Sequence, residues 1–240
     1  MEDLSIVIPC YNEALNIPTL INEFEAVVKE RKDISIILVD NGSTDNSQVV
    51  LQQTIAKSPF KDIFEIVHVP INKGYGHGIL QGLFATKTSV IAWTHADLQT
   101  PPKDVIAAFD SYKGMKMEQP NKEIFVRGIR KKRAWGATFF TWGMGVMSSM
   151  ALSQKLYDVN AQPKLFSKSF FDRIQSEAPN DFSLDLYFLY HAQQQCIMKE
   201  IPVFFHNRVH GEAKGGGSLK TRIKLIKRTY QYIFELKAKL

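Results

Sequence analysis

The first hundred residues alternate between short runs rich in isoleucine and valine and longer stretches of helical periodicity. This alternation restricts the fold more than any other feature of the chain. The apolar runs are Leu4–Ile8, Ile34–Val39, Phe64–Val69 and Val90–Thr94. Runs of this kind are typical of strands buried on both faces of a sheet. Helical patterns occupy the intervening stretches, at about residues 16–31, 46–58 and 74–86. Strand and helix in repeated order predict right-handed βαβ units and an open, mainly parallel α/β sheet with helices on both faces.

Polar, turn-rich segments follow all four predicted strands. They are PCYNE at 9–13, DNGS at 40–43, NKGYGHG at 72–78 and HAD at 95–97. Because ligands of open α/β sheets bind at the carboxyl ends of the strands, their convergence predicts a binding site. Single segments are weaker evidence. DNGS alone is typical of a strand-to-helix turn, and the glycines suit either a ligand or close packing on a neighbouring helix.

The segment from His95 to Gln99 predicts a divalent-metal site. Asp97 and Gln99, two residues apart, would place two oxygen donors on the same side of an extended chain, and His95 would share that side. Mg²⁺ and Mn²⁺ prefer oxygen ligands and share them with substrate phosphates. Imidazole suits Mn²⁺ better than Mg²⁺. The alternative is that Asp97 only caps a helix that starts at Pro101 and Pro102.

The second half of the chain is less regular. Its patterns predict a strand at 123–127, a helix at about 181–195 and a strand at about 198–205. The uncharged run Trp135–Leu152 favours a buried or interfacial helix over a membrane span, because glycine, serine and threonine dilute it. Arg208 and Lys214 lie around a glycine-rich loop after the last strand, where cations can close over a diphosphate.

The net charge of +6 is concentrated at the end of the chain. Seven Lys or Arg and one Glu in residues 219–240 also give +6, so the preceding residues are neutral overall. Apolar residues recur at helical spacing between these charges. Such a basic amphipathic helix suits an anionic membrane surface, or packs on the domain with its basic face exposed, and both readings stay open. No companion motif supports nucleic-acid binding. Two cysteines without a framework, and a start that lacks a signal-peptide pattern, predict a cytoplasmic location.

Five segments, in this order along the chain, resemble the family 2 glycosyltransferases of GT-A fold. They are IVIPCYNE, ILVDNGSTDNS, NKGYGHG, HADLQTPP and EIPVFFHNRVHGEAKGGGS. ADLQTPP and RVHGEAK are most similar to the polyprenyl- and dolichyl-phosphate sugar synthases, and DVNAQPKLFSK is similar to their acceptor-side segment. The resemblance implies one GT-A domain over 1–218. Within it, residues 1–100 would bind the nucleotide-sugar and residues 101–218 the acceptor, and the basic helix would occupy 219–240.

The resemblance also implies roles for individual residues. Asp97 and Gln99 would bind Mg²⁺ or Mn²⁺ with the donor diphosphate, while His95 stands where the family has an acid. Arg208 and Lys214 would close over the phosphates. The expected donor-binding residues are Pro9, Tyr11, Glu13, Asp40, Asn41, Lys73, Gly74 and Asp97, and the expected acceptor-phosphate residues are Arg127, Arg130 and Arg133.

These roles predict an inverting enzyme at the cytoplasmic membrane face. It would move a sugar from a UDP- or GDP-sugar to a polyprenyl phosphate, as a peripheral protein with or without a membrane-anchoring partner. A phosphate acceptor is already anionic, whereas a saccharide hydroxyl, the alternative acceptor, requires a carboxylate base, for which Asp181 and Asp185 are the candidates. A third reading is a non-catalytic nucleotide-sugar-binding or scaffold subunit, because His95 replaces an acid of the family's metal motif.

Overall fold

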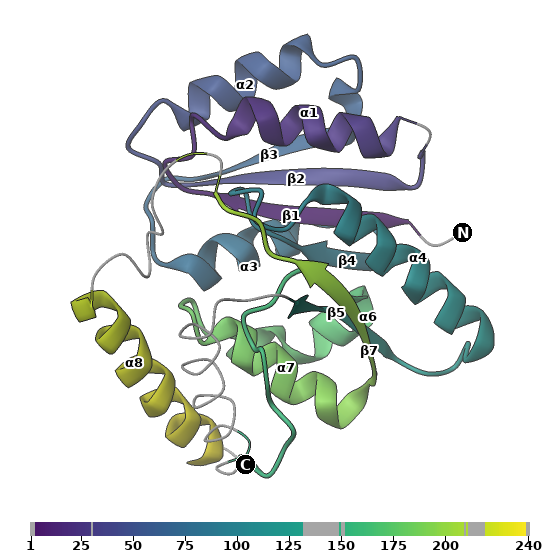
Figure 1. The fold of residues 1–240 in the computed structure, drawn as a ribbon, viewed down its shortest axis with the longest axis vertical. Coiled ribbons are helices and arrows are strands. Elements are labelled where there is room, and N and C mark those ends of the chain that lie inside the picture. The colour runs from purple at the N-terminus through teal and green to yellow at the C-terminus, as the bar shows by residue number, and fades with distance from the viewer. Residues whose placement is uncertain are drawn as a thin grey trace.

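The computed structural model describes residues 3–29, 31–131, 149, 152–208, 210 and 219–238, with side chains of the last helix from Lys227 onward. In this part of the chain seven strands form one sheet in the order β3-β2-β1-β4-β6-β5-β7 (Figure 1). The strands are β1 Leu4–Cys10, β2 Ile34–Asn41, β3 Phe64–Val69, β4 Val90–Trp93, β5 Ile124–Lys131, β6 Lys164–Ser167 and β7 Ile197–Phe204. The helices are α1 Ile17–Val28, α2 Ser47–Lys57, α3 Tyr75–Ala85, α4 Pro102–Glu118, α6 Lys168–Ile174, α7 Leu184–Gln195 and α8 Leu219–Ala238.

Two apolar cores cover the two faces of the sheet, as strands without an exposed face require. Side chains of β1 alternate between them, so that Ile6 and Ile8 face one core and Val7 the other. Helices α1 and α4 close the first core with side chains such as Phe24 and Phe109. Helices α3, α6, α7 and α8 close the second. The predicted α/β class is confirmed, with β1, β2, β3 and β4 paired in parallel.

The second half of the sheet is mixed. Strand β6 lies between β4 and β5 and is antiparallel to both, while β5 and β7 pair in parallel. The predicted strands at 123–127 and 198–205 correspond to β5 and β7, whereas no sequence pattern indicated β6. Its four residues are all buried, and they run directly into α6. A strand this short, without alternation, cannot be distinguished from other buried segments by its pattern.

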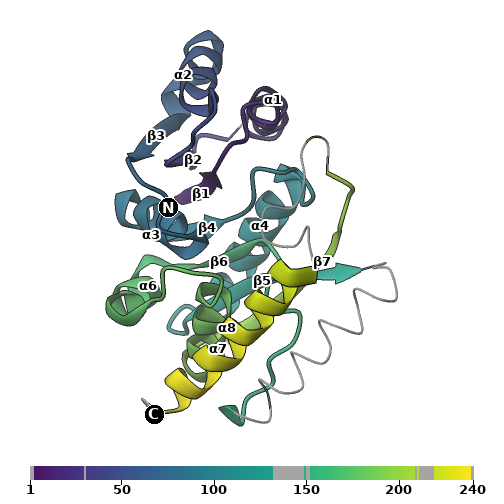
Figure 2. The same cartoon turned by 90° about the vertical axis from the view of Figure 1, so that its left-hand side faces the viewer.

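Helix α8 packs on the domain in the way that one of the two readings predicts. Tyr232, Ile233 and Leu236 are buried in the second core, while Lys227 and Lys237 stay exposed. The helix lies on the α6–α7 side of the molecule, away from α1 and α2 (Figures 1 and 2). None of the described helices is apolar over a length that would span a bilayer. Most of the uncharged run predicted as a buried or interfacial helix lies outside the described residues.

Candidate active site

The loops after β1 and β2 are joined by the side chain of Asn12. Its Oδ1 accepts hydrogen bonds from the backbone N–H groups of Thr44 at 2.7 Å and Asp45 at 3.3 Å. Its own N–H donates to Oγ of Ser43 at 3.0 Å, and it has a left-handed φ of 53°, which asparagine tolerates better than most residues. The N–H of Glu13 adds a bond of 2.8 Å to Oγ of Ser47. The loops after β1 and β2 therefore form one unit at the edge of the sheet.

Asp40 sits at the end of β2 with only 1% of its surface exposed. Its Oδ1 accepts from the N–H of Ser43 at 3.1 Å, and its Oδ2 lies 3.1 Å from Nδ1 of His68, its register partner in β3. Gly42 follows with φ of 70°, and a Cβ there would lie 2.4 Å from the backbone nitrogen of Asn72. Only glycine fits this approach. The turn that presents Asp40 is therefore fixed by backbone sterics.

The glycine-rich segment before and within α3 packs against protein. A Cβ on Gly74 or Gly76 would lie 2.6 Å from a backbone oxygen of the 179–181 loop, and one on Gly78 would lie 2.6 Å from Asn41. Asn41 in turn donates from Nδ2 to the carbonyl of Gly74 at 3.0 Å. These contacts pack the glycines closely against the 179–181 loop and the end of β2, where the packing reading expected a neighbouring helix. The adjacent Lys73 is exposed, and Tyr11 and Glu13 are half-buried.

Asp97 is a buried carboxylate with two partners. Its Oδ1 accepts from the N–H of Gln99 at 3.1 Å, and its Oδ2 lies 2.7 Å from Nη2 of Arg208. Leu98 has a φ of 56°, so the chain turns here. The expectation that Asp97 and Gln99 share one side of an extended chain is therefore wrong. A leucine rarely adopts a positive φ, so the residue types did not indicate this turn.

The segment after β7 crosses the carboxyl edge of the sheet. The N–H of His206 donates to the carbonyl of Gln99 at 2.9 Å, and Nε2 of Gln99 donates to the carbonyl of His206 at 3.1 Å. Two residues on, Arg208 reaches Asp97, and Nδ2 of Asn16 donates to the carbonyl of His210 at 3.3 Å. The structure thus brings Arg208 to the edge of the sheet where the polar loops meet. Lys214, its expected companion, lies outside the described residues.

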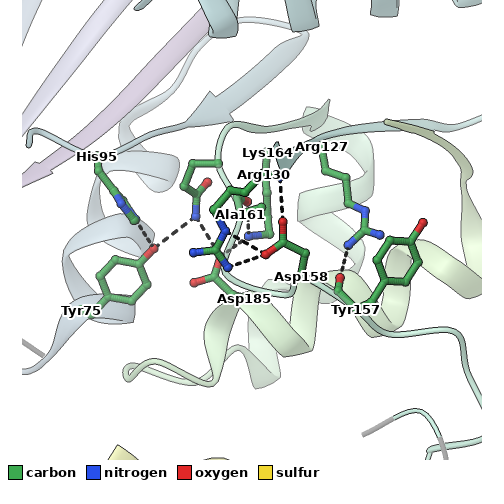
Figure 3. A network of polar contacts seen from close by, with 10 residues as sticks. Tyr75, His95, Arg127, Arg130, Tyr157, Asp158, Ala161, Lys164 and Asp185 are labelled. Atoms are coloured by element: carbon green, nitrogen blue, oxygen red, sulfur yellow. Dashed lines mark hydrogen bonds and ion pairs between the residues drawn. The ribbon is translucent and has the colours of Figure 1, made fainter. Parts of the chain in front are cut away.

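His95 directs its imidazole to Tyr75, with 3.0 Å between Nε2 and the hydroxyl oxygen. Figure 3 shows this contact at one end of a polar network that continues to Asp185. Nε2 of Gln162 lies 3.4 Å from the Tyr75 hydroxyl and 2.9 Å from Oδ1 of Asp185, which also contacts Nζ of Lys164. Burial lowers the pKa of His95, so the imidazole is neutral near pH 7.

Carboxylates of this chain hold the two described arginines expected at the acceptor phosphate. Arg127 is 1% exposed and lies 2.6 Å from Glu200, its register partner in β7. Arg130 donates from Nε to Oδ1 of Asp158 at 2.8 Å (Figure 3). Neither acid was predicted from its residue pattern. Only the β5–β7 register would have revealed Glu200. The third arginine, Arg133, lies outside the described residues.

The two candidate bases lie in different surroundings. Asp185 is 1% exposed and shares a buried ion pair with Lys164, which is equally buried. Asp181 precedes α7, and its Oδ2 accepts from Nε of Arg228 in α8 at 2.6 Å. Burial raises the pKa of Asp181, but the hydrogen bonds from Arg228 and from the N–H of Ser183 outweigh it, and the net shift is downward. Both carboxylates therefore already have partners.

Known proteins match parts of this chain. Undecaprenyl-phosphate 4-deoxy-4-formamido-L-arabinose transferases from Pseudomonas fluorescens (strain Pf0-1) and Pseudomonas aeruginosa (strain LESB58) are 39% identical over 107 residues and 35% identical over 105. Each match covers 42% of this chain and 30% of the relative, so the matched part of the chain spans less than a third of these proteins.

The solved structures of glucosyl-3-phosphoglycerate synthase from Mycobacterium tuberculosis share the fold. The complex with Mn²⁺, uridine diphosphate and phosphoglyceric acid has a TM-score of 0.70 at 15% identity, over 98% of this chain and 78% of that one. The complex with Mn²⁺ and uridine-diphosphate-glucose gives 0.70 at 16% identity, over 100% and 80%. At this level of identity the likeness establishes the GT-A fold alone.

One family model covers more than half of the chain. The model for Glycosyl transferase family 2 matches residues 5–154, which include β1 to β5 and the loops that carry Asn12, Asp40 and Asp97. The chain therefore belongs to glycosyl transferase family 2.

Proposed function

We propose that this chain is an inverting glycosyltransferase that moves a sugar from a UDP- or GDP-sugar to a polyprenyl phosphate. The observation that carries the proposal is the pairing of Asp97 with Arg208 at the edge where the donor loops meet. A metal–diphosphate complex requires these two charges, a carboxylate for the cation and a guanidinium for the phosphates. The names of the undecaprenyl-phosphate sugar transferases support the lipid acceptor.

The residues around Asp97 fit a divalent cation that is shared with the donor. Mg²⁺ in phosphate-binding sites is held by one or two carboxylates together with substrate phosphates. Asp97 supplies one buried carboxylate, with Gln99 on the same turn. Within the described residues no three His, Cys, Asp or Glu side chains converge, so an all-protein cage is not formed there. Once bound, Mg²⁺ or Mn²⁺ would neutralise charge on the departing nucleoside diphosphate.

The side chains of this chain would then position the reactants. Asp40 would accept hydrogen bonds from the nucleobase, beside the loop unit that contains Tyr11 and Glu13. Arg208 would donate to the diphosphate, and Lys214 would join it. A phosphate oxygen of the acceptor would attack the anomeric carbon as the bond to the nucleotide phosphate oxygen breaks, which inverts the configuration at that carbon.

A phosphate acceptor suits the described carboxylates better than a hydroxyl does. Asp185 is paired with Lys164 and Asp181 with Arg228. Each carboxylate would have to break its ion pair before it could act as a base. An anionic phosphate needs no base. The Arg127 side chain is 1% exposed and that of Arg130 is 10% exposed. We therefore assign the acceptor phosphate to Arg130, which would exchange Asp158 for it, and to Arg133.

Transfer assays test the acceptor. With Mn²⁺ and a panel of radiolabelled UDP- and GDP-sugars, we expect label to move to a short polyprenyl phosphate but not to the corresponding polyprenol or to free saccharides. The polyprenol is the matched control, because it differs from the acceptor only in the phosphate. Transfer to saccharides instead would support the hydroxyl-acceptor alternative. If the assays detect neither transfer nor donor hydrolysis, the result would support the non-catalytic reading.

We further propose that the protein works as a peripheral enzyme at the cytoplasmic membrane face. On α8, the exposed residues include Lys227, Lys237 and Phe234, which is 65% exposed, while the opposite face of the helix packs on the domain. A basic residue near an anionic bilayer contributes about 1 kcal/mol, or about fivefold in affinity. The exposed face of α8 therefore offers charge to the membrane without unfolding.

Vesicle flotation tests this surface. Lys227→Glu with Lys237→Glu should reduce binding to anionic phosphatidylglycerol vesicles by at least about twenty-fivefold, on the basis of two lysines at about 1 kcal/mol each. The control is Lys57→Glu with Lys61→Glu, an exposed pair of which Lys57 ends α2 and Lys61 follows four residues later. Equal flotation of the two double variants would reject membrane contact through α8.

A further inference from the structure

Tyr75 connects the candidate active site to the interior of the molecule. Its hydroxyl meets Nε2 of His95 at 3.0 Å, and its ring stacks on Phe182 with centroids 4.7 Å apart and planes 6° from parallel. We propose that Tyr75 is a positioning residue for Asp97. It holds the His95 imidazole, and through it the turn that carries Asp97, so His95 anchors this turn instead of binding the metal. This inference rests on the proposed function, because it concerns the carboxylate assigned to the cation.

Tyr75 is itself held in place from three directions. It is the first residue of α3, and the N–H of His77, two residues on, donates to the carbonyl of Asn180 at 2.9 Å. Phe182, from the same loop as Asn180, covers one face of the Tyr75 ring. Gln162 lies beside the Tyr75 hydroxyl, and its amide donates a 2.9 Å hydrogen bond to Asp185. The hydroxyl thus has a fixed position from which to orient His95.

His95 lies between Thr94, which is still hydrogen-bonded to β1, and Asp97, the candidate metal ligand. The N–H of Thr94 donates to the carbonyl of Val7 at 3.1 Å, and the left-handed turn at Leu98 follows Asp97. The His95 side chain thus contacts α3 two residues before Asp97. Its Nε2 faces the Tyr75 hydroxyl, and the two rings meet edge to face at 5.7 Å. An imidazole in this arrangement supports the neighbouring ligand in the way that outer-shell groups support metal ligands.

The decisive variant is Tyr75→Phe, which removes only the hydroxyl. Loss of an outer-shell partner lowers metal affinity about 10- to 100-fold, and we expect a loss in this range for Mn²⁺ in titration calorimetry with UDP and, in parallel, with GDP. The matched control is Tyr187→Phe, which removes a buried hydroxyl donating to the carbonyl of Ile174 at 2.5 Å. Both variants should lower the melting temperature, but only Tyr75→Phe should weaken Mn²⁺ binding. Equal Mn²⁺ affinity in the two variants would overturn the proposal.

His95 variants separate an anchor from a ligand. Glutamine offers Tyr75 a hydrogen-bonding partner and leucine does not, so His95→Gln should retain more of the Mn²⁺ affinity than His95→Leu. Pulsed electron paramagnetic resonance of the Mn²⁺–nucleotide complex should show no imidazole nitrogen coupling. A coupling that disappears in His95→Gln would overturn the assignment, as would a gain of Mg²⁺ affinity in His95→Asp. If the unmodified chain binds neither nucleotide with Mn²⁺, the proposed function fails, and the inference with it.

Discussion

Asp97→Asn should reduce kcat/KM for sugar transfer by at least about a hundredfold, because single groups that stabilise transition-state charge contribute about 10²- to 10³-fold. The substitution keeps the size of the side chain and its acceptor for the N–H of Gln99. It removes the charge that faces Arg208 and that would hold the cation. The Mn²⁺ affinity in the presence of UDP or GDP should fall together with the rate. Initial-rate kinetics and calorimetry on the same preparations check both effects.

The control for this substitution is Asp110→Asn. Asp110 is a half-exposed acid on α4, paired with Arg31 at 3.1 Å and with Lys113 at 3.5 Å. Its replacement should leave both rate and metal affinity unchanged. If Asp97→Asn retains kcat/KM within about threefold of the unmodified chain, a difference below 1 kcal/mol, Asp97 does not act on transition-state charge and the proposed metal position is wrong.

Lys164→Met should lower the free energy of unfolding by about 3–5 kcal/mol, the usual consequence of removing one member of a buried ion pair. Lys164 and Asp185 are each 1% exposed. Burial lowers the pKa of Lys164 and Asp185 opposes this shift, so each charge depends on the other. Without the ammonium, the carboxylate of Asp185 keeps the hydrogen bond from Gln162 but has lost its counter-ion. Urea denaturation followed by circular dichroism measures the loss.

Two further variants distinguish a buried charge from lost packing. The double variant Lys164→Met with Asp185→Leu should recover most of the stability, because replacing both members of a buried pair by apolar groups is often neutral or favourable. Lys168→Met, which breaks the exposed pair with Asp172 four residues along α6, should cost at most about 1 kcal/mol. A loss at Lys164 no larger than the loss at Lys168 would contradict the prediction.

The regular half of the fold could be predicted from residue patterns. Strands β1 to β4 carry continuous Ile- and Val-rich runs, and the polar segments after them do meet at one edge, as the joined loops of Asn12 and Ser43 show. The family resemblance assigned Asp97 and Arg208 to the same diphosphate, but it did not predict their direct ion pair. This pair could not follow from spacing, because the segment after β7 reaches the β4 end only through the complete sheet.

Buried polar pairs could not be predicted in the same way. Periodicity marks apolar residues as buried, whereas Lys164 and Arg127 are buried against the general preference for charged groups at the surface. Their partners follow from tertiary contacts. Glu200 is opposite Arg127 only because of the β5–β7 register, and Asp185 reaches Lys164 from α7, across the second core. Lys164 itself belongs to β6, whose four residues carry no strand pattern of their own.

The ion pair between Asp97 and Arg208 has a consequence for the order in which ligands bind. A divalent cation that arrives alone has to compete with the guanidinium for the same carboxylate oxygen, 2.7 Å from Nη2. A cation that arrives with a diphosphate brings a new anion for Arg208 at the moment it takes Asp97, so that no buried charge is left without a partner. Under the proposed function, nucleotide and metal should each raise the affinity for the other by the same factor, since such coupling is reciprocal. When the nucleoside diphosphate leaves, renewed pairing of the two side chains would favour release of the cation with it.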